Sequence, residues 1–410
     1  MNKVEGQKIR SSISLVFIVM LLAFSFGTIS SGIPILQGES TFIRSPTFRT
    51  AQYTNHAPII IENDSDFQLR GFNGSGTKAD PYVMEDMNIS NDYGQCIVIE
   101  HTSAYFIIRH SVMRSADDAM YLNAMGNGTI QDCTIRAYFS GIQADNCTSL
   151  ELIGNDIVGS EYGVSLSGVN DTEVQNCRIH HSNNGLALHR SQRINITGCV
   201  LYANFGYGIY VGHASGGIYV FSNSIGWNGD YTGYTLNTTT NALDDSTVGR
   251  GRTDDWIGNH WSDYNGTGPY LIPGVFSKND SLPTLLIDAV APSVSGDEDM
   301  RLYIGETGQY IHWNSSDVHM FIFRVYLDGS QVSSGYWYGG QLEYTLDGLS
   351  VGSHNYTAVF FDCAGNGASN QIWVSILLDI FGEGTILIFY SSVLSVAVVA
   401  MMLVIMKKIR

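Results

Sequence analysis

One short pattern occurs six times between about Cys96 and Ile225, and it constrains the fold more than any other feature of the sequence. Its clearest copies read ELIGNDI, EVQNCRI, NITGCVL and YVFSNSI. Aligning the copies gives a repeat of about 22 residues. One column of the alignment, at spacings of 23, 22, 22, 22 and 24 residues, holds His110, Cys133, Asn155, Cys177, Cys199 and Asn223.

Apolar columns lie on both sides of this column. Three residues before it stand Ile107, Ile130, Leu152, Val174, Ile196 and Val220, and two residues after it stand Val112, Ile135, Ile157, Ile179, Leu201 and Ile225. A repeat this short cannot bury an apolar face alone, so its copies must stack and share a core. Alternation at period two predicts strands, and the returns are rich in Gly and Asn rather than helical. The pattern therefore predicts a parallel β-helix, with successive coils about 4.8 Å apart.

The Asn and Cys column is expected inside such a coil. Stacked Asn amides can hydrogen-bond along the axis, and a buried Cys packs as a small hydrophobe. Cys177 and Cys199 would lie on adjacent coils, near enough for a disulfide if their Cβ directions allow it. We favour buried free thiols.

Both ends of the chain carry targeting patterns. Residues 1–31 have basic residues, an apolar run and then small residues, which predicts a secretory signal peptide cleaved near Ser31, with an uncleaved anchor as the alternative. Residues 385–406 contain no charge and are followed by the basic tail 407–410, which predicts a transmembrane helix with a cytoplasmic C-terminus. We therefore expect a single-pass cell-membrane protein whose bulk is extracellular.

Composition fits an exterior protein. Twelve Asn-X-Ser/Thr sequons occur, and we expect some to be glycosylated. The formal net charge is −17, which argues against a nucleic-acid partner because nothing would neutralise phosphates.

The start and end of the coil region carry a family resemblance. Residues 32–57 have no periodicity and predict an irregular stretch, whereas residues 58–81 suit a cap over the first coil. The motifs GSGTKADPYVM and GNHWSDYNGTGPYLIPG, together with the repeats, resemble the NosD-type right-handed parallel β-helix proteins. The resemblance covers residues 58–288 and implies a pectin-lyase-like fold, in a group that binds or hydrolyses carbohydrate.

The resemblance does not supply a cofactor. The closing motif lacks the longer Asp/Gly-rich insert of relatives, so calcium is possible but no other cofactor is expected. The copper chemistry linked to the NosD name needs soft ligands or imidazoles. His180 and His181 form an isolated pair that we interpret as a solvated turn, so we predict no metal ligand.

Residues 289–380 change character. Alternating runs such as FIFRVYL, HNYTAVFF and QIWVSIL, separated by Asp-Gly turns, predict an immunoglobulin-like or fibronectin-like β-sandwich. Cys363 is its single cysteine, so no disulfide joins the sheets. The whole chain is thus expected to be all-β, with a right-handed parallel β-helix, an Ig-like sandwich and a C-terminal transmembrane helix.

Polysaccharide-cleaving β-helices need carboxylates clustered on one outer face, and an enzyme is expected to bring at least three into one groove. The three outward columns that we compared contain no such cluster, so we predict no catalytic residue. A polar strip after the first strand of each repeat is the candidate ligand-binding row. It comprises Glu100, His101, Asp145, Asn146, His189, Arg190 and His213.

Trp256 and Trp261 follow the last clear repeat. Closure of the apolar core is the favoured interpretation, and a sugar-stacking platform is the alternative.

The first functional hypothesis is a non-enzymatic, membrane-anchored surface protein whose β-helix binds an extracellular glycan or a neighbouring surface protein. A polysaccharide lyase, hydrolase or epimerase is the second hypothesis. A NosD-like metal accessory protein is the third.

Overall fold

The computed structural model describes residues 53–158, 161–232, 234–246, 254–276 and 278–378. Every described residue lies within residues 44–410, which form one compact unit. The expected signal peptide, transmembrane helix and cytoplasmic tail lie outside the described residues. Within the described ranges, no helix is long and apolar enough to cross a membrane.

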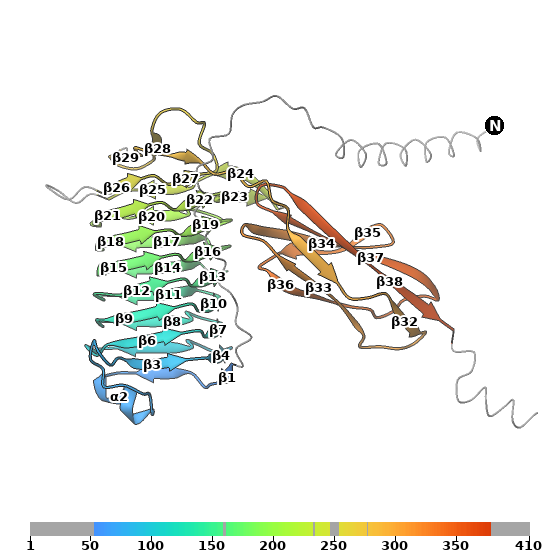
Figure 1. Ribbon diagram of the computed structural model, residues 1–410, viewed down its shortest axis with the longest axis horizontal. Helices are drawn as coiled ribbons and strands as arrows, with labels where there is room; N and C mark the ends of the chain where they lie inside the picture. The colour runs from blue at the N-terminus through green and yellow to red at the C-terminus, as the bar shows by residue number, and fades with distance from the viewer. Residues whose placement is uncertain (1–52, 159–160, 233, 247–253, 277, 379–410) are drawn as a thin grey trace, which may run out of the picture. The chain divides into compact units, whose positions relative to one another are not determined.

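Three parallel sheets run along the first part of the chain, and most coils contribute one strand to each sheet (Figure 1). Sheet A contains β1 (Thr54–Asn55), β4 (Met87–Asn91), β7 (Val112–Ser115), β10 (Thr134–Ala137), β13 (Asp156–Val158), β16 (Arg178–His180), β19 (Val200–Tyr202), β22 (Ser224–Gly226), β27 (His260–Trp261) and β30 (Thr284–Leu285). Sheet B contains β2 (Ile59–Ile61), β5 (Ile97–Glu100), β8 (Met120–Asn123), β11 (Ser140–Asp145), β14 (Tyr162–Ser167), β17 (Asn184–His189), β20 (Ile209–Val211) and β25 (Ala242–Asp244).

Sheet C completes each coil and ends in an antiparallel pair. It contains β3 (Tyr82–Glu85), β6 (Phe106–Arg109), β9 (Gly128–Gln131), β12 (Glu151–Ile153), β15 (Asn170–Gln175), β18 (Gln192–Thr197), β21 (Gly216–Phe221), β26 (Asp255–Ile257), β29 (Lys278–Asp280) and β28 (Tyr270–Ile272). A separate antiparallel hairpin, β23 (Gly229–Thr232) and β24 (Thr235–Thr239), interrupts the coils. The 22-residue repeat thus forms the predicted parallel β-helix.

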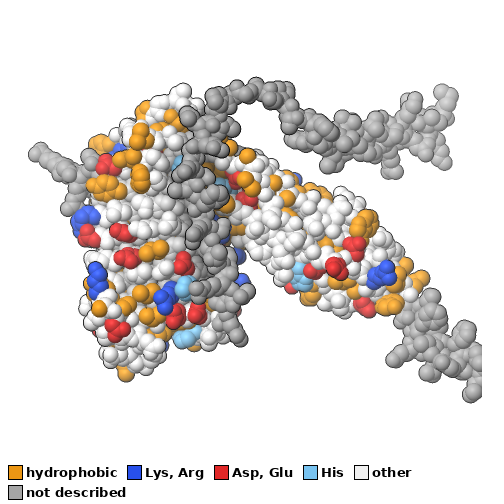
Figure 2. Space-filling model, in the orientation of Figure 1, with side chains coloured by type: hydrophobic (Ala, Val, Ile, Leu, Met, Phe, Trp, Pro, Cys, Tyr) orange, Lys and Arg blue, Asp and Glu red, His pale blue; other side chains and the backbone are white. Residues whose placement is uncertain are grey.

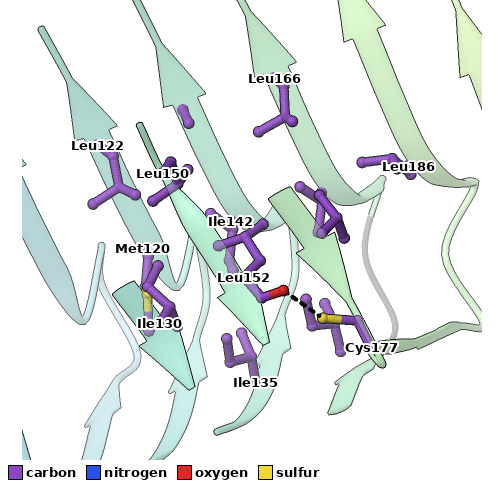
Figure 3. Close-up of a cluster of buried hydrophobic side chains, with 14 of the residues drawn as sticks. Met120, Leu122, Ile130, Ile135, Ile142, Leu150, Leu152, Leu166, Cys177 and Leu186 are labelled. Atoms are coloured by element: carbon purple, nitrogen blue, oxygen red, sulfur yellow. Dashed lines mark hydrogen bonds between the residues drawn. The ribbon is translucent and has the colours of Figure 1, made fainter. Parts of the chain in front are cut away.

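The core of the coils is built by the alternation of each strand. Ile130, Leu152 and Val174 lie opposite one another on successive strands of sheet C and are fully buried. Figure 3 shows side chains of this kind pointing into the shared interior. The residues between them point outward, so the inward set fixes which residues line the surface.

The Asn and Cys column forms the expected interior ladder. The side-chain amide of Asn155 donates to the carbonyl of Ile130 at 2.8 Å and accepts from the backbone N–H of Cys133 at 3.0 Å. Three coils further on, the side chain of Asn223 accepts the equivalent hydrogen bond from the backbone N–H of Cys199. Cys177 and Cys199 are buried on neighbouring coils, and all five cysteines of the coils are free thiols, as favoured from the sequence.

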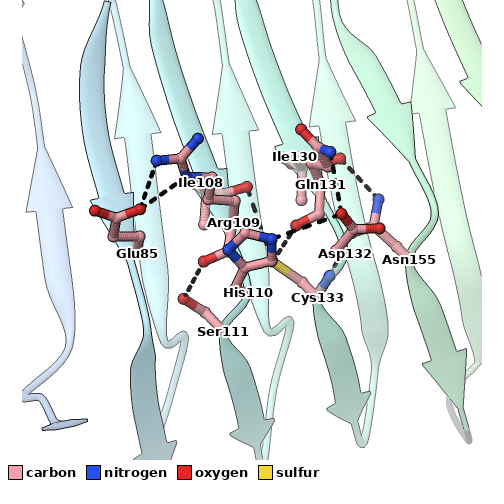
Figure 4. Close-up of polar contacts among 10 residues, drawn as sticks. All are labelled: Glu85, Ile108, Arg109, His110, Ser111, Ile130, Gln131, Asp132, Cys133 and Asn155. Atoms are coloured by element: carbon pink, nitrogen blue, oxygen red, sulfur yellow. Dashed lines mark hydrogen bonds and ion pairs between the residues drawn. The ribbon is translucent and has the colours of Figure 1, made fainter. Parts of the chain in front are cut away.

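The alignment of the sequence repeats placed the first copy one residue out of the register that the structure shows. Arg109 pairs with Gln131, so Ser111 and not His110 occupies the ladder position (Figure 4). His110 lies in the positive-φ turn, where its Nε2 is 3.7 Å from an oxygen of Asp132. By the same shift, Ile108 and Met113 are the inward residues, whereas Ile107 and Val112 are only half-buried. A spacing of 22 therefore holds for this coil too.

Both ends of the core are covered. At the first coil the short helix α2 (Asp64–Leu69) inserts Phe67, whose ring stacks 4.6 Å from that of Tyr82. At the last coil Trp256 and Trp261 are buried with their rings 6.0 Å apart. Closure of the core is thus the correct interpretation of the two tryptophans, and their burial excludes the sugar-stacking alternative.

Residues 293–377 form two further sheets around a second core, which includes Trp313 and Phe360. The smaller sheet contains β31 (Ser293–Gly296), β33 (Tyr310–Ser316) and β36 (Gly340–Thr345). The larger contains β32 (Met300–Tyr303), β38 (Gly367–Leu377), β37 (Gly352–Asp362), β34 (Met320–Leu327) and β35 (Ser330–Tyr336). We call this part the sandwich.

Candidate functional site

The predicted polar strip is a real row in space. Glu100, Asp145 and His189 end alternate strands of sheet B, and Asn123 and Ser167 end the strands between them in the same register. The residues that follow, His101, Asn146 and Arg190, are exposed and adopt positive φ. His213 is also exposed, and its carbonyl accepts from the N–H of Arg190.

Side chains of the strip form hydrogen bonds with neighbouring side chains of sheet B. Asn123 donates to Glu100 at 3.0 Å, and Gln143 donates to Asp145 at 2.8 Å. None of the strip's residues lines the groove described next. The strip therefore forms a polar edge rather than a hollow.

A groove of about 440 Å³ lies around the corner from this strip, on the outward side of sheet C. Lys78 and Pro81 line it beside the first coils, together with Tyr105, Phe106 and Ile107. The following coils contribute their corner residues and the first outward residues of β9, β12 and β15. These are Asn127, Thr129, Ser149, Glu151, Asp171 and Glu173.

The outward column of sheet C supplies the floor of the groove. Thr129 pairs with Glu151, and Glu151 pairs with Glu173. Because Leu152 and Val174 must point into the core, the residue before each must point outward. The column continues past the groove through Asn195 to Tyr219, which is 48% exposed.

The corner residues are held by the backbone. Asn127, Ser149 and Asp171 all adopt φ between 53° and 57°, and this recurring left-handed position turns each coil from sheet B into sheet C. The side chain of Asp171 forms an ion pair with Arg193, the corner residue of the next coil. One edge of the groove is therefore a row of polar side chains at coil spacing.

Charge in the groove is mainly negative. Glu151, Asp171 and Glu173 contribute three carboxylates, against Lys78 among the lining residues and Arg193 at the edge. Thr129 donates its hydroxyl to Glu151 at 3.3 Å, and Gln175 donates to Glu173 at 2.5 Å. The carboxylates of Glu151 and Glu173 have further lone pairs that can accept hydrogen bonds from a ligand.

This cluster was not predicted from the sequence. Glu151 and Glu173 belong to the outward column immediately before Ile130, Leu152 and Val174, which is not one of the three columns compared above. The same 22-residue spacing would have found the pair, because both precede an apolar residue of the repeat. The three columns compared from the sequence thus did not include the one with neighbouring carboxylates, and the absence of a catalytic residue stays a prediction.

His180 and His181 are not a solvated turn. Both are buried, with exposed fractions of 0% and 2%, on the outward side of sheet A. Phe321 and Tyr336 of the sandwich pack against the ring of His181. The burial of this pair could not be predicted from the local sequence, because Phe321, which contacts His181, lies 140 residues further along the chain.

One group of possible metal ligands occurs among the described residues, outside the groove. Asp288, Asp317 and His319 each place a ligand atom within 4.8 Å of the others. Nδ1 of His319 lies 2.7 Å from a carboxylate oxygen of Asp288, so the group is already joined without an ion. The groove itself offers carboxylate and hydroxyl oxygens, which suit hard cations such as calcium.

Residues 95–248 match the family model described as "Right handed beta helix region", and this match indicates that the coils are right-handed. The search of curated proteins finds no match. Among solved structures, an alginate lyase from Paenibacillus sp. is similar at 14% identity and a TM-score of 0.38, over 53% of this chain and 91% of that one. The tailspike protein 2 of bacteriophage CBA120 is similar at 10% identity and a TM-score of 0.36, over 78% and 71%.

Fibronectin(III)-like modules of Clostridium thermocellum CbhA give 14% identity and a TM-score of 0.20, over 26% of this chain. The chain spans about half of the length of that structure, 54%. These scores carry no inference about activity, which has to come from the groove itself.

Proposed function

We propose that this chain binds an extended polysaccharide along the outward side of sheet C, with the groove at Thr129, Glu151 and Glu173 as its main contact. One observation carries the proposal: hydrogen-bonding side chains stand in register on successive coils along the floor of an open groove. A polysaccharide is itself a repeating chain. It can therefore present a hydroxyl-bearing unit to each coil, at a spacing of about 4.8 Å.

The side chains suit sugar hydroxyls. A carboxylate accepts hydrogen bonds from neighbouring hydroxyls of one ring, and such charge-assisted bonds are stronger than neutral ones. Tyr219, in the same column beyond the groove, presents a ring on which the apolar face of a sugar can stack. The column thus combines polar and stacking contacts along one line.

The charge of the groove selects the kind of polysaccharide. Three carboxylates face one lysine among the lining residues, and Asp171 is further neutralised by Arg193. A uronic-acid polymer would meet like charge at Glu151 and Glu173, whereas a neutral or amino-sugar chain would not. We therefore infer that the ligand is neutral or carries amines.

Location at the cell surface is part of the proposal. Its support is in the sequence: a signal-like segment at residues 1–31 and an uncharged segment at 385–406 enclose the coils and the sandwich. Anchored in this way, the sandwich would act as a spacer between the membrane and the coils.

Hydrolysis of the bound glycan is the second candidate function. Glu151 and Glu173 stand on neighbouring coils of one column, and Asp171 lines the same groove, which meets the expectation of three carboxylates in one groove. Glycoside hydrolysis uses two carboxyl groups, one to protonate the leaving oxygen and one to act as nucleophile or to activate water. Glu151 and Glu173 would be that pair.

A glycan array on the full chain separates the two functions, if each bound glycan is then incubated with the protein and analysed for shortened products. Binding without products supports the first function, and products that disappear in Glu151→Gln and Glu173→Gln support the second. A preference for uronic-acid polymers would contradict the proposed ligand class. Absence of any glycan binding would overturn both functions.

A further inference from the structure

Part of the outward side of sheet A is fully covered, although outward residues of a β-helix ordinarily face solvent. His180 and Tyr202, from neighbouring strands of this sheet, are 0% exposed, and Asp156 is 5% exposed. The ring of His181 lies 5.5 Å from that of Tyr336 and 6.4 Å from that of Phe321. His181 is therefore covered directly by the sandwich, whereas His180 is covered by Tyr202, whose ring packs against His319 of the sandwich.

The two histidines complete a chain of polar contacts that reaches the sandwich. An oxygen of Asp156 lies 3.0 Å from Nε2 of His180. Nδ1 of His180 lies 2.9 Å from Nδ1 of His181. Nε2 of His181 lies 3.3 Å from the backbone carbonyl oxygen of Phe321, which belongs to β34.

Protons can be counted along this chain. The contacts to Asp156 and to Phe321 end on oxygens that only accept, so each needs a proton on its imidazole nitrogen. The contact between His180 and His181 needs a third proton, on one of the two Nδ1 atoms. Two neutral imidazoles carry two protons in all. A neutral pair therefore leaves one of the three contacts without a proton, and one added proton would complete the chain.

The surrounding charges oppose that added proton. Asp156 is already paired with Arg178, whose guanidinium donates two hydrogen bonds to it at 2.9 and 2.8 Å. A second cation, Arg136, lies over the ring of Tyr338, and the Tyr338 ring in turn lies 5.0 Å from that of His181. A further positive charge here would be buried without a countercharge, which costs more than one completed hydrogen bond returns.

The other titratable groups around the pair do not supply the missing countercharge. The carboxylate of Asp317 already accepts from the backbone N–H of His319 at 2.7 Å, and its backbone carbonyl accepts from Arg178. The ring of His319 packs edge-on against Tyr202. Tyr202 and Tyr336 are phenols whose pKa is raised by burial, so they stay neutral. Burial likewise raises the pKa of the Cys363 thiol and keeps it neutral.

We propose that His180 and His181 form an acid-released catch between the coils and the sandwich, closed while both imidazoles are neutral and opened when they take up protons. Burial lowers the pKa of His180 to about 4, and it also holds the pKa of His181 below its usual range. With the sandwich away, both rings return toward the ordinary value of about 6.5. The contact is therefore at full strength above about pH 6.5 and weakens as the pH falls toward 4. For His180 alone, a pKa of about 4 in the closed state and about 6.5 in the open state favours opening at pH 5 on the order of thirtyfold, compared with neutral pH.

Hydrogen–deuterium exchange on the full chain tests the catch, with rates corrected for the intrinsic effect of pH. Between pH 7.5 and pH 5, amides of residues 178–182 and 319–323 should exchange at least tenfold faster, while amides of the interior strands at residues 130–135 should not change. In the double variant His180→Gln/His181→Gln this response should disappear, because Gln can donate to the Phe321 carbonyl and does not titrate. His312→Gln removes a partly exposed imidazole in β33 of the sandwich and should respond as the wild type does.

Unchanged exchange at the contact between pH 7.5 and pH 5 in the wild type would overturn the proposal, and so would an equal response in the double variant. If the double variant does not fold, NMR titration of the wild-type imidazoles decides. Two rings that stay neutral until the contact opens support the catch, whereas a ring that is protonated at pH 7 contradicts it.

Discussion

Glu151 and Glu173 are register partners, standing at the same position on neighbouring coils of sheet C. The interior imposes this arrangement, because Leu152 and Val174 next to them are fully buried. Two carboxylates are thus held side by side on a rigid strand surface, at the floor of a groove of about 440 Å³. Rigid placement of this kind lowers the entropic cost of binding an extended ligand.

Glu173→Gln should weaken glycan binding about tenfold, which corresponds to about 1.4 kcal/mol. The substitution keeps the shape of the side chain but removes the charge that strengthens its hydrogen bonds to sugar hydroxyls. Isothermal titration with the array-selected oligosaccharide measures the effect. Glu161→Gln, which alters an exposed carboxylate outside the groove, is the matched control and should bind as the wild type does. Equal affinity of the wild type and Glu173→Gln would remove this residue from the site.

Tyr219→Ala should weaken the binding of long oligosaccharides but not that of short ones. Tyr219 stands two coils beyond Glu173 in the same outward column, so only a ligand that extends past Asn195 can reach its ring. Stacking on an aromatic ring contributes about 0.5–1.5 kcal/mol, which corresponds to about a twofold to twelvefold loss of affinity. Titration with a series of increasing chain length tests this, and an equal loss at every length would argue against one continuous binding line.

Much of the fold could be predicted from the sequence because stacking preserves the repeat. Spacings of 22 residues correctly placed Cys133, Asn155, Cys177 and Cys199 in one interior ladder. The first copy failed because Ile107 and Val112 are apolar although they point outward, and this made a one-residue shift look acceptable. In a strand, such a shift exchanges the inner and outer faces.

The candidate site was predictable only in part. The strip from Glu100 to His189 is a true row, but the groove begins around the next corner, at residues that the comparison of columns did not include. The buried state of His180 could not be predicted, because its cover comes from strands that no repeat relates to the coils. The periodicity of the sequence predicts the coils, but it does not predict which other residues pack against them.

Asn155→Ala should lower the free energy of unfolding by about 2–6 kcal/mol. It leaves the buried carbonyl of Ile130 and the N–H of Cys133 without their partner, at a cost of about 1–3 kcal/mol for each. Asn155→Cys should cost less, because Cys177 holds the same position one coil on and its thiol donates to Leu152. Denaturant unfolding measures both, with Asn123→Ala on the outward side as the control. Equal losses for Ala and Cys would contradict the role given to the ladder.

Gly163→Ala should destabilise the coils by about 1–3 kcal/mol. A methyl group here would stand 2.3 Å from Cγ2 of Ile179 and 2.6 Å from the carbonyl oxygen of Gly185, which is closer than atoms can approach. Gly94→Ala is the control, since its nearest neighbour would be 3.7 Å away. Thermal unfolding of the two variants should separate them, and similar midpoints would show that the coils can expand at this corner.

Lys278→Met should cost about 3–5 kcal/mol by breaking a buried ion pair. Lys278 contacts both Asp244 and Asp254, whose side chains are 0% and 1% exposed beneath the last coil. Removing the cation leaves two buried carboxylates without a countercharge. Denaturant unfolding checks the loss, with the exposed Lys78→Met as the control. A loss below about 1 kcal/mol would mean that the cluster relaxes toward solvent.

The crystal structure of the chain with the oligosaccharide selected by the array tests the central claim most directly. We predict sugar units lying along sheet C, with hydroxyls of successive units bonded to Glu151 and Glu173 and the far end approaching Tyr219. A sugar bound elsewhere, with the column of Thr129, Glu151 and Glu173 left open to water, would contradict the account.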